Sequence, residues 1–339
     1  MIWPFKDSEE SKARKQRDKE YQAQCADAIK ALERGEILPR ARERIEKQMA
    51  AGHQMFSSDL SVNEFLVAKE SGLQILGQVM GTAFYDTGWP SLVGRRTGEI
   101  WEVSNAHRQA RNAAVMRLKK EAELFGADGV IGVRLKSDSN WPNMVEFTAV
   151  GTAVKIPGWS EADRTDSPFV CDLSAQEFWQ LLETGYRPSN IVFGICAYYI
   201  ATDLYTRQLT NPGLNFVGNQ EVERYTEGYY TARRIATRQL EDDIGQWHAD
   251  GCVGMTVSST LRDIEYERSD IKYHDLIITF VAIGSSIKRL TNPQPKRTKP
   301  MLTCLNLASK QFVSLGSRTR GLGGKALQEN FAEDFDEQE

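Results

Sequence analysis

Three side chains in the second half of the chain could bind a metal ion. Cys196, His248 and Cys252 are soft or imidazole ligands of the kind that zinc and other transition metals prefer. His248 and Cys252 are four residues apart, and Cys196 lies on an earlier expected strand of the same half. The alternative is that both cysteines are small buried hydrophobes and that the histidine lies on the surface. A divalent-metal site is one hypothesis, and no other cofactor is indicated.

No pattern for catalysis is evident in the sequence. The four histidines lie in no recognisable motif, and neither G-x-S-x-G nor H-E-x-x-H occurs. The run from Gly126 to Gly132 resembles a phosphate-binding loop, but the expected helix precedes the glycines instead of following them. We therefore predict no catalytic and no cofactor-binding residue, and we favour a protein that is not an enzyme.

Aromatic residues gather where two expected strands end. They are Phe84, Tyr85 and Trp89 in the first half, and Tyr198 and Tyr199 in the second. Rigid aromatic side chains at strand ends suit subunit contacts or a ligand pocket, although ordinary packing is the plainer explanation. We treat these five residues as a possible interface. An enzyme with its active site at these strand ends stays open as an alternative.

The elements that must position these residues occur twice. The first copy has blocks at residues 59–65, 127–132 and 147–151, and the second repeats them at 172–178, 249–254 and 280–284. The distance between copies grows from 113 to 122 to 133 residues, so the second copy carries two insertions. A repeat of roughly 100 residues is a whole domain.

The same capping and turn residues recur in each copy. A Ser-x-x-Glu capping box begins a short helix that ends at a glycine, and a further glycine interrupts the next strand. An Ala-Asp-Gly turn then joins the long helix to a strand, and its aspartate is expected to accept a neighbouring amide of the turn. In the first copy these positions are Ser61, Glu64, Gly72, Gly81, Asp128, Gly129 and Gly132; in the second they are Ser174, Glu177, Gly185, Gly194, Asp250, Gly251 and Gly254.

These patterns predict an α+β fold with two tandem domains. Each domain is expected to be a small, mainly antiparallel sheet packed on one long amphipathic helix. The predicted domains span 58–157 and 170–289, and a linker spans 158–169. A charged helical arm at 1–57 precedes them, and removing residues 1–50 should leave both domains folded. Residues 290–339 are expected to be a proline-rich basic linker and a mobile acidic tail.

Composition argues against several classes of protein. The 339 residues carry a net charge of −4 with both signs balanced, so no nucleic-acid partner is predicted. No apolar run reaches about 18 residues, so no transmembrane segment is predicted. Five scattered cysteines without a C-x-x-C pair favour a reducing compartment, and we expect the cytoplasm. Trp3-Pro4-Phe5 could touch a membrane surface, a question that the sequence leaves open.

Two stretches resemble the YbjQ-like family, which is also called the "putative heavy-metal-binding domain". They are Gly126 to Val133, with the order G-A-D-G-V-I-G-V, and Phe147 to Val154, which contains G-T-A-V. The resemblance covers about 58–157 and, in a diverged form, about 170–289. It implies a small α+β subunit that forms a closed ring, typically a pentamer, through its edge strands. The family's activity is not established.

Together these observations predict a homo-oligomeric, ring-forming scaffold or binding protein. Its arm and tail would be the surfaces for a protein partner. The alternative is a metal- or small-ligand-binding protein with sites at domain or subunit interfaces. For a duplicated chain, five copies could form two stacked tiers, or the two domains could alternate within one ring.

Overall fold

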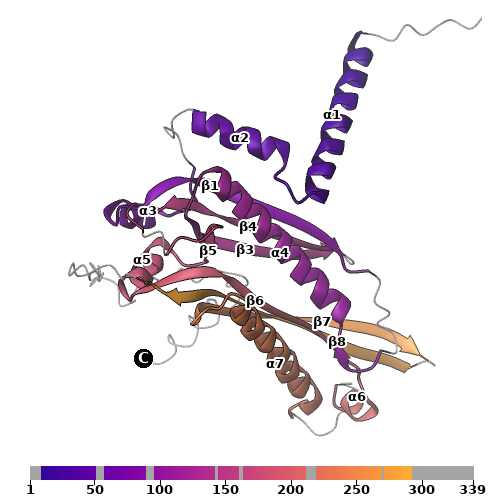
Figure 1. Ribbon diagram of the computed structural model, residues 1–339. Coiled ribbons are helices and arrows are strands. Elements are labelled where there is room, and N and C mark those ends of the chain that lie inside the picture. Colours follow the sequence, from indigo (N-terminus) through magenta and orange to yellow (C-terminus); the bar gives the residue numbers. More distant parts are fainter. Residues whose placement is uncertain are drawn as a thin grey trace, which may run out of the picture. The chain divides into compact units, whose positions relative to one another are not determined.

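The computed structural model describes residues 9–50, 57–88, 95–141, 144–159, 163–210, 219–268 and 271–291. The chain divides into two compact units, whose elements are labelled in Figure 1. Unit 1 comprises residues 1–90 and 105–172, and unit 2 comprises residues 91–104 and 173–339. Each unit therefore includes a short segment that belongs, by sequence, to the other half of the chain.

Unit 1 is built on a four-stranded sheet in the order β1-β4-β3-β5. Strands β1 (Gln74–Asp86), β4 (Met144–Lys155) and β3 (Gly129–Trp141) are antiparallel to their neighbours. The two-residue strand β5 (Phe169–Val170) adds to β3 in the parallel direction. The long helix α4 (Trp101–Leu124) begins in unit 2, and its residues from Asn105 onward belong to unit 1. Helices α1 (Glu9–Glu33), α2 (Pro39–Ala50) and α3 (Val62–Glu70) complete the unit.

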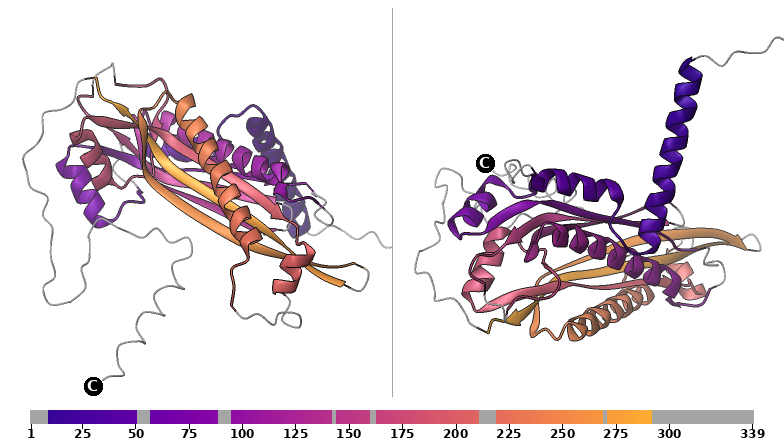
Figure 2. Two further views of the ribbon diagram at one scale, coloured as in Figure 1. Left: turned by 90° about the horizontal axis from the view of Figure 1, so that it is seen from below. Right: turned by 45° about the horizontal axis from the view of Figure 1, so that its top comes forward.

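Unit 2 is built on a second four-stranded sheet, in the order β2-β6-β8-β7. Strands β6 (Tyr186–Ile200), β8 (Ile271–Arg289) and β7 (Gly251–Arg268) are antiparallel, and β2 (Gly98–Glu99) adds to β6. Helix α7 (Glu223–Gln246) crosses one face of this sheet, as Figure 2 shows. The short helices α5 (Ala175–Glu183) and α6 (Leu204–Thr210) flank β6 in the chain.

Small residues let each long helix lie close to its sheet. On α4, Ala110, Ala114 and Leu118 are fully buried. A Cβ on Gly81 of β1 would overlap the carbonyl oxygen of Ala114 and lie 2.7 Å from the amide nitrogen of Leu118. In unit 2, a Cβ on Gly194 would meet the backbone of Ala236 and Leu240 in the same way. The strand glycines are therefore required by the close approach of the helix backbone.

The expected capping boxes stand at the start of α3 and α5. In α3, Ser61 Oγ accepts the Glu64 N–H at 3.3 Å, and the Glu64 carboxylate accepts the Ser61 N–H at 2.6 Å. Ser174 and Glu177 make the same two bonds in α5, at 3.3 and 2.8 Å. These reciprocal bonds satisfy two amide groups that a helix start otherwise leaves without partners. After each helix, Gly72 and Gly185 have φ values of 80° and 83°.

The mixed α+β class expected from the sequence is confirmed. The units differ in extent from the predicted domains, because residues 91–104 lie in unit 2 and residues 158–172 lie in unit 1. Within residues 1–57, the structure has α1 over 9–33 and α2 over 39–50. Trp3-Pro4-Phe5 and the predicted tail beyond residue 291 lie outside the described residues. Within the described part of the chain, no helix is both long and apolar enough to cross a membrane.

Candidate functional site

The outer edge of β1 is closed by side chains over the middle of the strand. The Met80 N–H donates to the Glu121 carboxylate of α4 at 3.0 Å, and Arg44 of α2 binds the same carboxylate at 2.9 Å. Burial raises the pKa of Glu121, and the Met80 amide and Arg44 oppose that rise. Three side chains donate to strand carbonyls: Arg44 to Gln78, Gln48 to Leu76, and Arg117 to Thr82. This closure keeps the middle of the strand from pairing with another strand.

The outer edge of β6 is closed by the same device in its first part. The Phe193 N–H donates to Asp243 of α7 at 3.0 Å, and the Ile195 N–H donates to the Gln239 side-chain oxygen at 3.2 Å. At the repeat spacing, Asp243 corresponds to Glu121 and Phe193 corresponds to Met80. An acid at this helix position in both halves was the one signal in the sequence that could have indicated this role.

Beyond Ile195, residues that precede α4 take over the edge of β6. The Ile100 N–H donates to the Ala197 carbonyl at 2.7 Å, and the Ala197 N–H donates to Ser104 Oγ at 3.0 Å. Strand β2 then pairs Gly98 with Tyr199. Ile100, only 1% exposed, packs in a small core with Ala197 and Tyr199. The backbone of residues 98–100, together with the Ser104 hydroxyl, therefore completes this end of the sheet.

The two Ala-Asp-Gly turns are tied to the end of a neighbouring strand. Asp128 accepts the Ile156 N–H at 2.7 Å, and Asp250 accepts the Arg289 N–H at 2.7 Å. The bonds run across the sheet to the residues that follow or end β4 and β8, not to amides of the same turn as expected. After each turn, Gly132 (φ 63°) and Gly254 (φ 66°) lie at a register shift in β3 and β7. A glycine at positive φ is the mark of the G1 type of β-bulge.

The first residues of β3 and β7 differ in what covers them. A Cβ on Gly129 of β3 would overlap the ring of Phe169 from β5, whereas no heavy atom lies within 4 Å of a Cβ built on Gly251 of β7. Val133 of β3 is 1% exposed, but Met255, at the corresponding position of β7, is 57% exposed. The part of β7 that matches the covered part of β3 is therefore bare. Sequence reasoning placed Gly129 and Gly251 in turns and did not anticipate Phe169 as the cover of one of them.

The predicted interface aromatics divide between covered and exposed positions. Tyr199 is fully buried and its hydroxyl donates to Asp275, which also raises the pKa of Tyr199 beyond the effect of burial. Tyr198 and Tyr85 are half-buried, and Phe84 is 57% exposed at the end of β1. Trp89 lies outside the described residues. Tyr198 and Tyr199 pair with Glu99 and Gly98 of β2 within the chain, and the predicted interface stays a prediction.

The structure does not bring the three predicted metal ligands together. Cys196 pairs with Phe280 of β8 and Cys252 pairs with Ser286, six positions further along the strand. At about 3.3 Å per residue, the two thiols belong to parts of the sheet roughly 20 Å apart. Cys196 is buried in the core under α7, and burial raises the pKa of its thiol to about 12. In the described ranges, no group of three or more His, Cys, Asp or Glu side chains could hold a metal ion.

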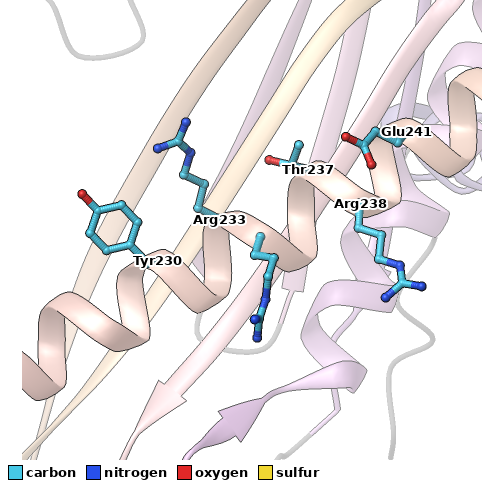
Figure 3. Close-up of a pocket in the computed structure, with 6 residues that line it drawn as sticks. Tyr230, Arg233, Thr237, Arg238 and Glu241 are labelled. Atoms are coloured by element: carbon cyan, nitrogen blue, oxygen red, sulfur yellow. The ribbon is translucent and has the colours of Figure 1, made fainter.

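A positively charged surface lies along α7. A hollow of about 490 Å³ is lined by Tyr230, Arg233, Arg234, Thr237, Arg238 and Glu241. Figure 3 shows that these side chains all extend from one helix. Because no second element faces them, the hollow is an open helix face and not an enclosed pocket. It offers three arginines and one glutamate on an open surface.

The comparisons with known proteins identify the family. Residues 66–157 match the model of the family described as "Putative heavy-metal-binding". The UPF0145 protein of Thermosipho africanus is 38% identical over 92 residues, which are 25% of this chain and 82% of that protein. The UPF0145 protein of Methanococcus vannielii is 33% identical over 96 residues, 27% of this chain and 89% of that protein.

The chain belongs to this YbjQ-like, or UPF0145, family.

A longer relative extends well beyond the region that the YbjQ-like family model matches. The "Encapsulin nanocompartment protein Rv1762c" of Mycobacterium tuberculosis is 29% identical over 251 residues, which are 72% of this chain and 89% of that protein. A match of 251 residues cannot be confined to the 66–157 region, so both units contribute to this similarity.

The metal-binding description of the YbjQ-like family has no matching ligand set in the described residues. Asp128, Asp250 and Glu121 all accept backbone amides. The cysteines lie apart, as described above. The described part of the chain therefore does not fit a resident metal ion.

Proposed function

We propose that this chain is a non-enzymatic assembly protein. Two YbjQ-like domains in tandem, within about 58–157 and 170–289, would join with further copies into a closed ring that acts as a scaffold. The observation that carries the proposal is the long relative that is named as an encapsulin nanocompartment protein. That similarity spans more than one domain, so it favours a shared role for the whole duplicated body.

The sheet edges give the proposal a physical reason. An exposed strand edge presents amide and carbonyl groups that pair readily with another chain, and proteins usually cover or block such edges. Here, β7 carries three exposed apolar side chains, Met255, Val257 and Leu261. A homo-oligomer that covers this strand would remove the hazard, and closed rings are a common solution among symmetric assemblies.

The number of chains and the location are also part of the proposal. Five chains is the number that the family resemblance favours. The scattered cysteines favour the cytoplasm. The N-terminal arm and the segment after residue 289 would be the surfaces offered to a protein partner.

Native mass spectrometry of the untagged full-length chain tests the proposal. We expect a discrete complex of several chains, with five favoured, whose mass equals the sum of the chain masses. At raised collision energy it should lose whole chains. A monomer at all micromolar concentrations would overturn the assembly function. A complex or monomer that carries a metal or small-molecule mass, lost in a Cys252→Ala variant, would instead support the alternative function of ligand binding.

A further inference from the structure

We propose that the bare end of β7 in one chain receives residues 56–58 of a second copy of the same chain. The inference rests on the assembly proposed above and names the surfaces that would form it.

In unit 1, residues 169–171, which lie between the linker and α5, cover the start of β3. Phe169 donates its N–H to the Asp128 carbonyl at 3.2 Å, Cys171 donates to the Val130 carbonyl at 3.0 Å, and Val133 donates to the Cys171 carbonyl at 3.0 Å. The Phe169 ring fills the space above Gly129. These contacts bury Val130 and Val133 almost completely.

The first copy contains a matching segment at the same distance from its capping box. Phe56, Ser57 and Ser58 precede Asp59, as Phe169, Val170 and Cys171 precede Asp172. The phenylalanine, which carries the contact with Gly129 in unit 1, is retained. Asp59 itself is held on unit 1 by Thr152 and Arg134. The chain just before Asp59 is therefore fixed in place at one end.

The receiving surface on β7 has the features of the covered surface on β3. Gly251 stands where Gly129 stands, with no heavy atom within 4 Å of the position of a Cβ. Gly254 makes the same positive-φ bulge as Gly132, and Asp250 makes the same strand-end bond as Asp128. A phenylalanine ring is the group that this vacant space fits, because the ring of Phe169 occupies its counterpart.

The pattern of added segments indicates a head-to-tail contact with another chain. Segment β2 lies on β6, whereas segment β5 lies on β3, so the two sheets use different edges. A two-fold contact would use the same edge twice. A head-to-tail contact leaves one unfilled edge on each sheet, here the end of β1 and the start of β7. These two edges are complementary only if they belong to successive copies in a series.

The end of β1 supplies the reciprocal half of the same contact. Phe84 occupies the repeat position of Ala197, and Val222 and Thr226 occupy those of Ile100 and Ser104. Phe84 is 57% exposed, whereas Ala197 is fully buried under the Ile100 segment. The inferred contact therefore places Val222 of one copy on Phe84 of the next, with the Thr226 hydroxyl in place of Ser104.

A disulfide between chains tests the inferred register. Strand β3 pairs Gly129 with Phe169 and Val130 with Val170, so the proposal pairs Gly251 with Phe56 and Cys252 with Ser57. Neighbouring strands are about 4.8 Å apart, within the range that a disulfide spans. A Ser57→Cys variant, with Cys25→Ser and Cys304→Ser, retains only Cys252 and the fully buried Cys171 and Cys196 as other cysteines.

On mild oxidation, this variant should give a ladder of covalently joined chains on a non-reducing denaturing gel. The longest rung should match the chain count from native mass spectrometry, and adding Cys252→Ser should abolish the ladder. An intact native complex without the ladder, or with a disulfide only inside one chain, would overturn the inferred contact and leave the assembly function standing. Absence of any native complex would overturn both.

A second variant tests the space above Gly251 without any oxidation. Gly251→Leu should raise the concentration at which the complex half-dissociates by about tenfold or more, because the leucine occupies the site of the incoming ring. Its circular dichroism should be unchanged, because no heavy atom beyond the two chain neighbours lies within 4 Å of the Cβ position. Gly245→Leu on α7, where likewise no atom outside the helix backbone lies within 4 Å of the Cβ position, is the matched control and should leave assembly intact. Equal assembly of Gly251→Leu and the parent would overturn the inference.

Discussion

Gly81 and Gly194 set the distance between a helix and its sheet. In both units the helix backbone lies where a strand side chain would otherwise begin. The two contacts bring α4 and α7 closer to their sheets than the usual side-chain layer allows. A methyl group added at either glycine would therefore displace backbone atoms of the helix, and no side-chain rotation could relieve the overlap.

We expect Gly194→Ala to lower the free energy of unfolding by about 3 kcal/mol, since the new Cβ overlaps the Ala236 carbonyl. Gly245→Ala on α7 is the matched control, because no atom lies within 4 Å of its Cβ position. That substitution should be neutral or stabilising by up to about 1 kcal/mol. Urea unfolding followed by circular dichroism measures both, and equal destabilisation would contradict the close-approach argument.

We expect His107 of α4 to make the stability of the fold depend on pH. It is 8% exposed, and burial lowers its pKa from 6.5 to about 4. As the pH falls from 6.5 toward 4, the unfolded chain binds a proton that the folded chain does not, so the folded state loses about 3 kcal/mol. His107→Leu should remove this loss. Urea unfolding at pH 7.5 and 4.5 measures it, and an unchanged difference between the two pH values would contradict the assignment.

At the scale of elements, α2 closes part of the edge of β1. Ile45 is fully buried, and Arg44 links the Glu121 carboxylate of α4 to the Gln78 carbonyl of β1. By contrast, α1 is polar and mostly exposed. The two helices of the predicted arm therefore have different relations to unit 1, a distinction that their shared charge pattern hid.

We expect removal of residues 1–36 to leave the melting temperature almost unchanged. Removal of residues 1–50 should leave a cooperative transition but lower its midpoint, because it deletes Ile45 and opens the edge of β1, at a cost of about 2–5 kcal/mol. Differential scanning calorimetry of both truncations makes the comparison. Identical midpoints would show that α2 contributes nothing to unit 1, and a lost transition would refute the predicted domain boundary.

Local signals in the sequence predicted several elements because their cause is local. The capping boxes at Ser61 and Ser174 depend on residues three positions apart, and the structure has both. The partners of Asp128 and Asp250 depend on strand register, and these lie 28 and 39 residues away. The placement of residues 98–99 on β6 depends on packing between distant segments. No periodicity or spacing in the sequence encodes those contacts, and the suggested Cys196–Cys252 proximity failed for the same reason.

At the scale of the whole molecule, the proposed contacts use only residues between 56 and 289. We therefore expect a chain that ends at residue 292 to assemble as the full-length chain does. Native mass spectrometry of the two forms at equal concentration gives the comparison. The truncation retains Leu290, which is 6% exposed and donates its N–H to the Gly185 carbonyl. Loss of the complex would place an essential contact in the removed segment.

The difference between Gly129 and Gly251 has a consequence familiar from polymer chemistry. In the proposed contact, each copy carries one vacant acceptor surface, the start of β7, and one free donor segment, residues 56–58. Each copy would therefore be a bifunctional A–B monomer whose stoichiometry is always balanced. A copy that lacked only residues 56–58 would still accept a neighbour at β7 and then end the series, so it would be a chain terminator. Since every copy brings two units, any closed product contains an even number of them.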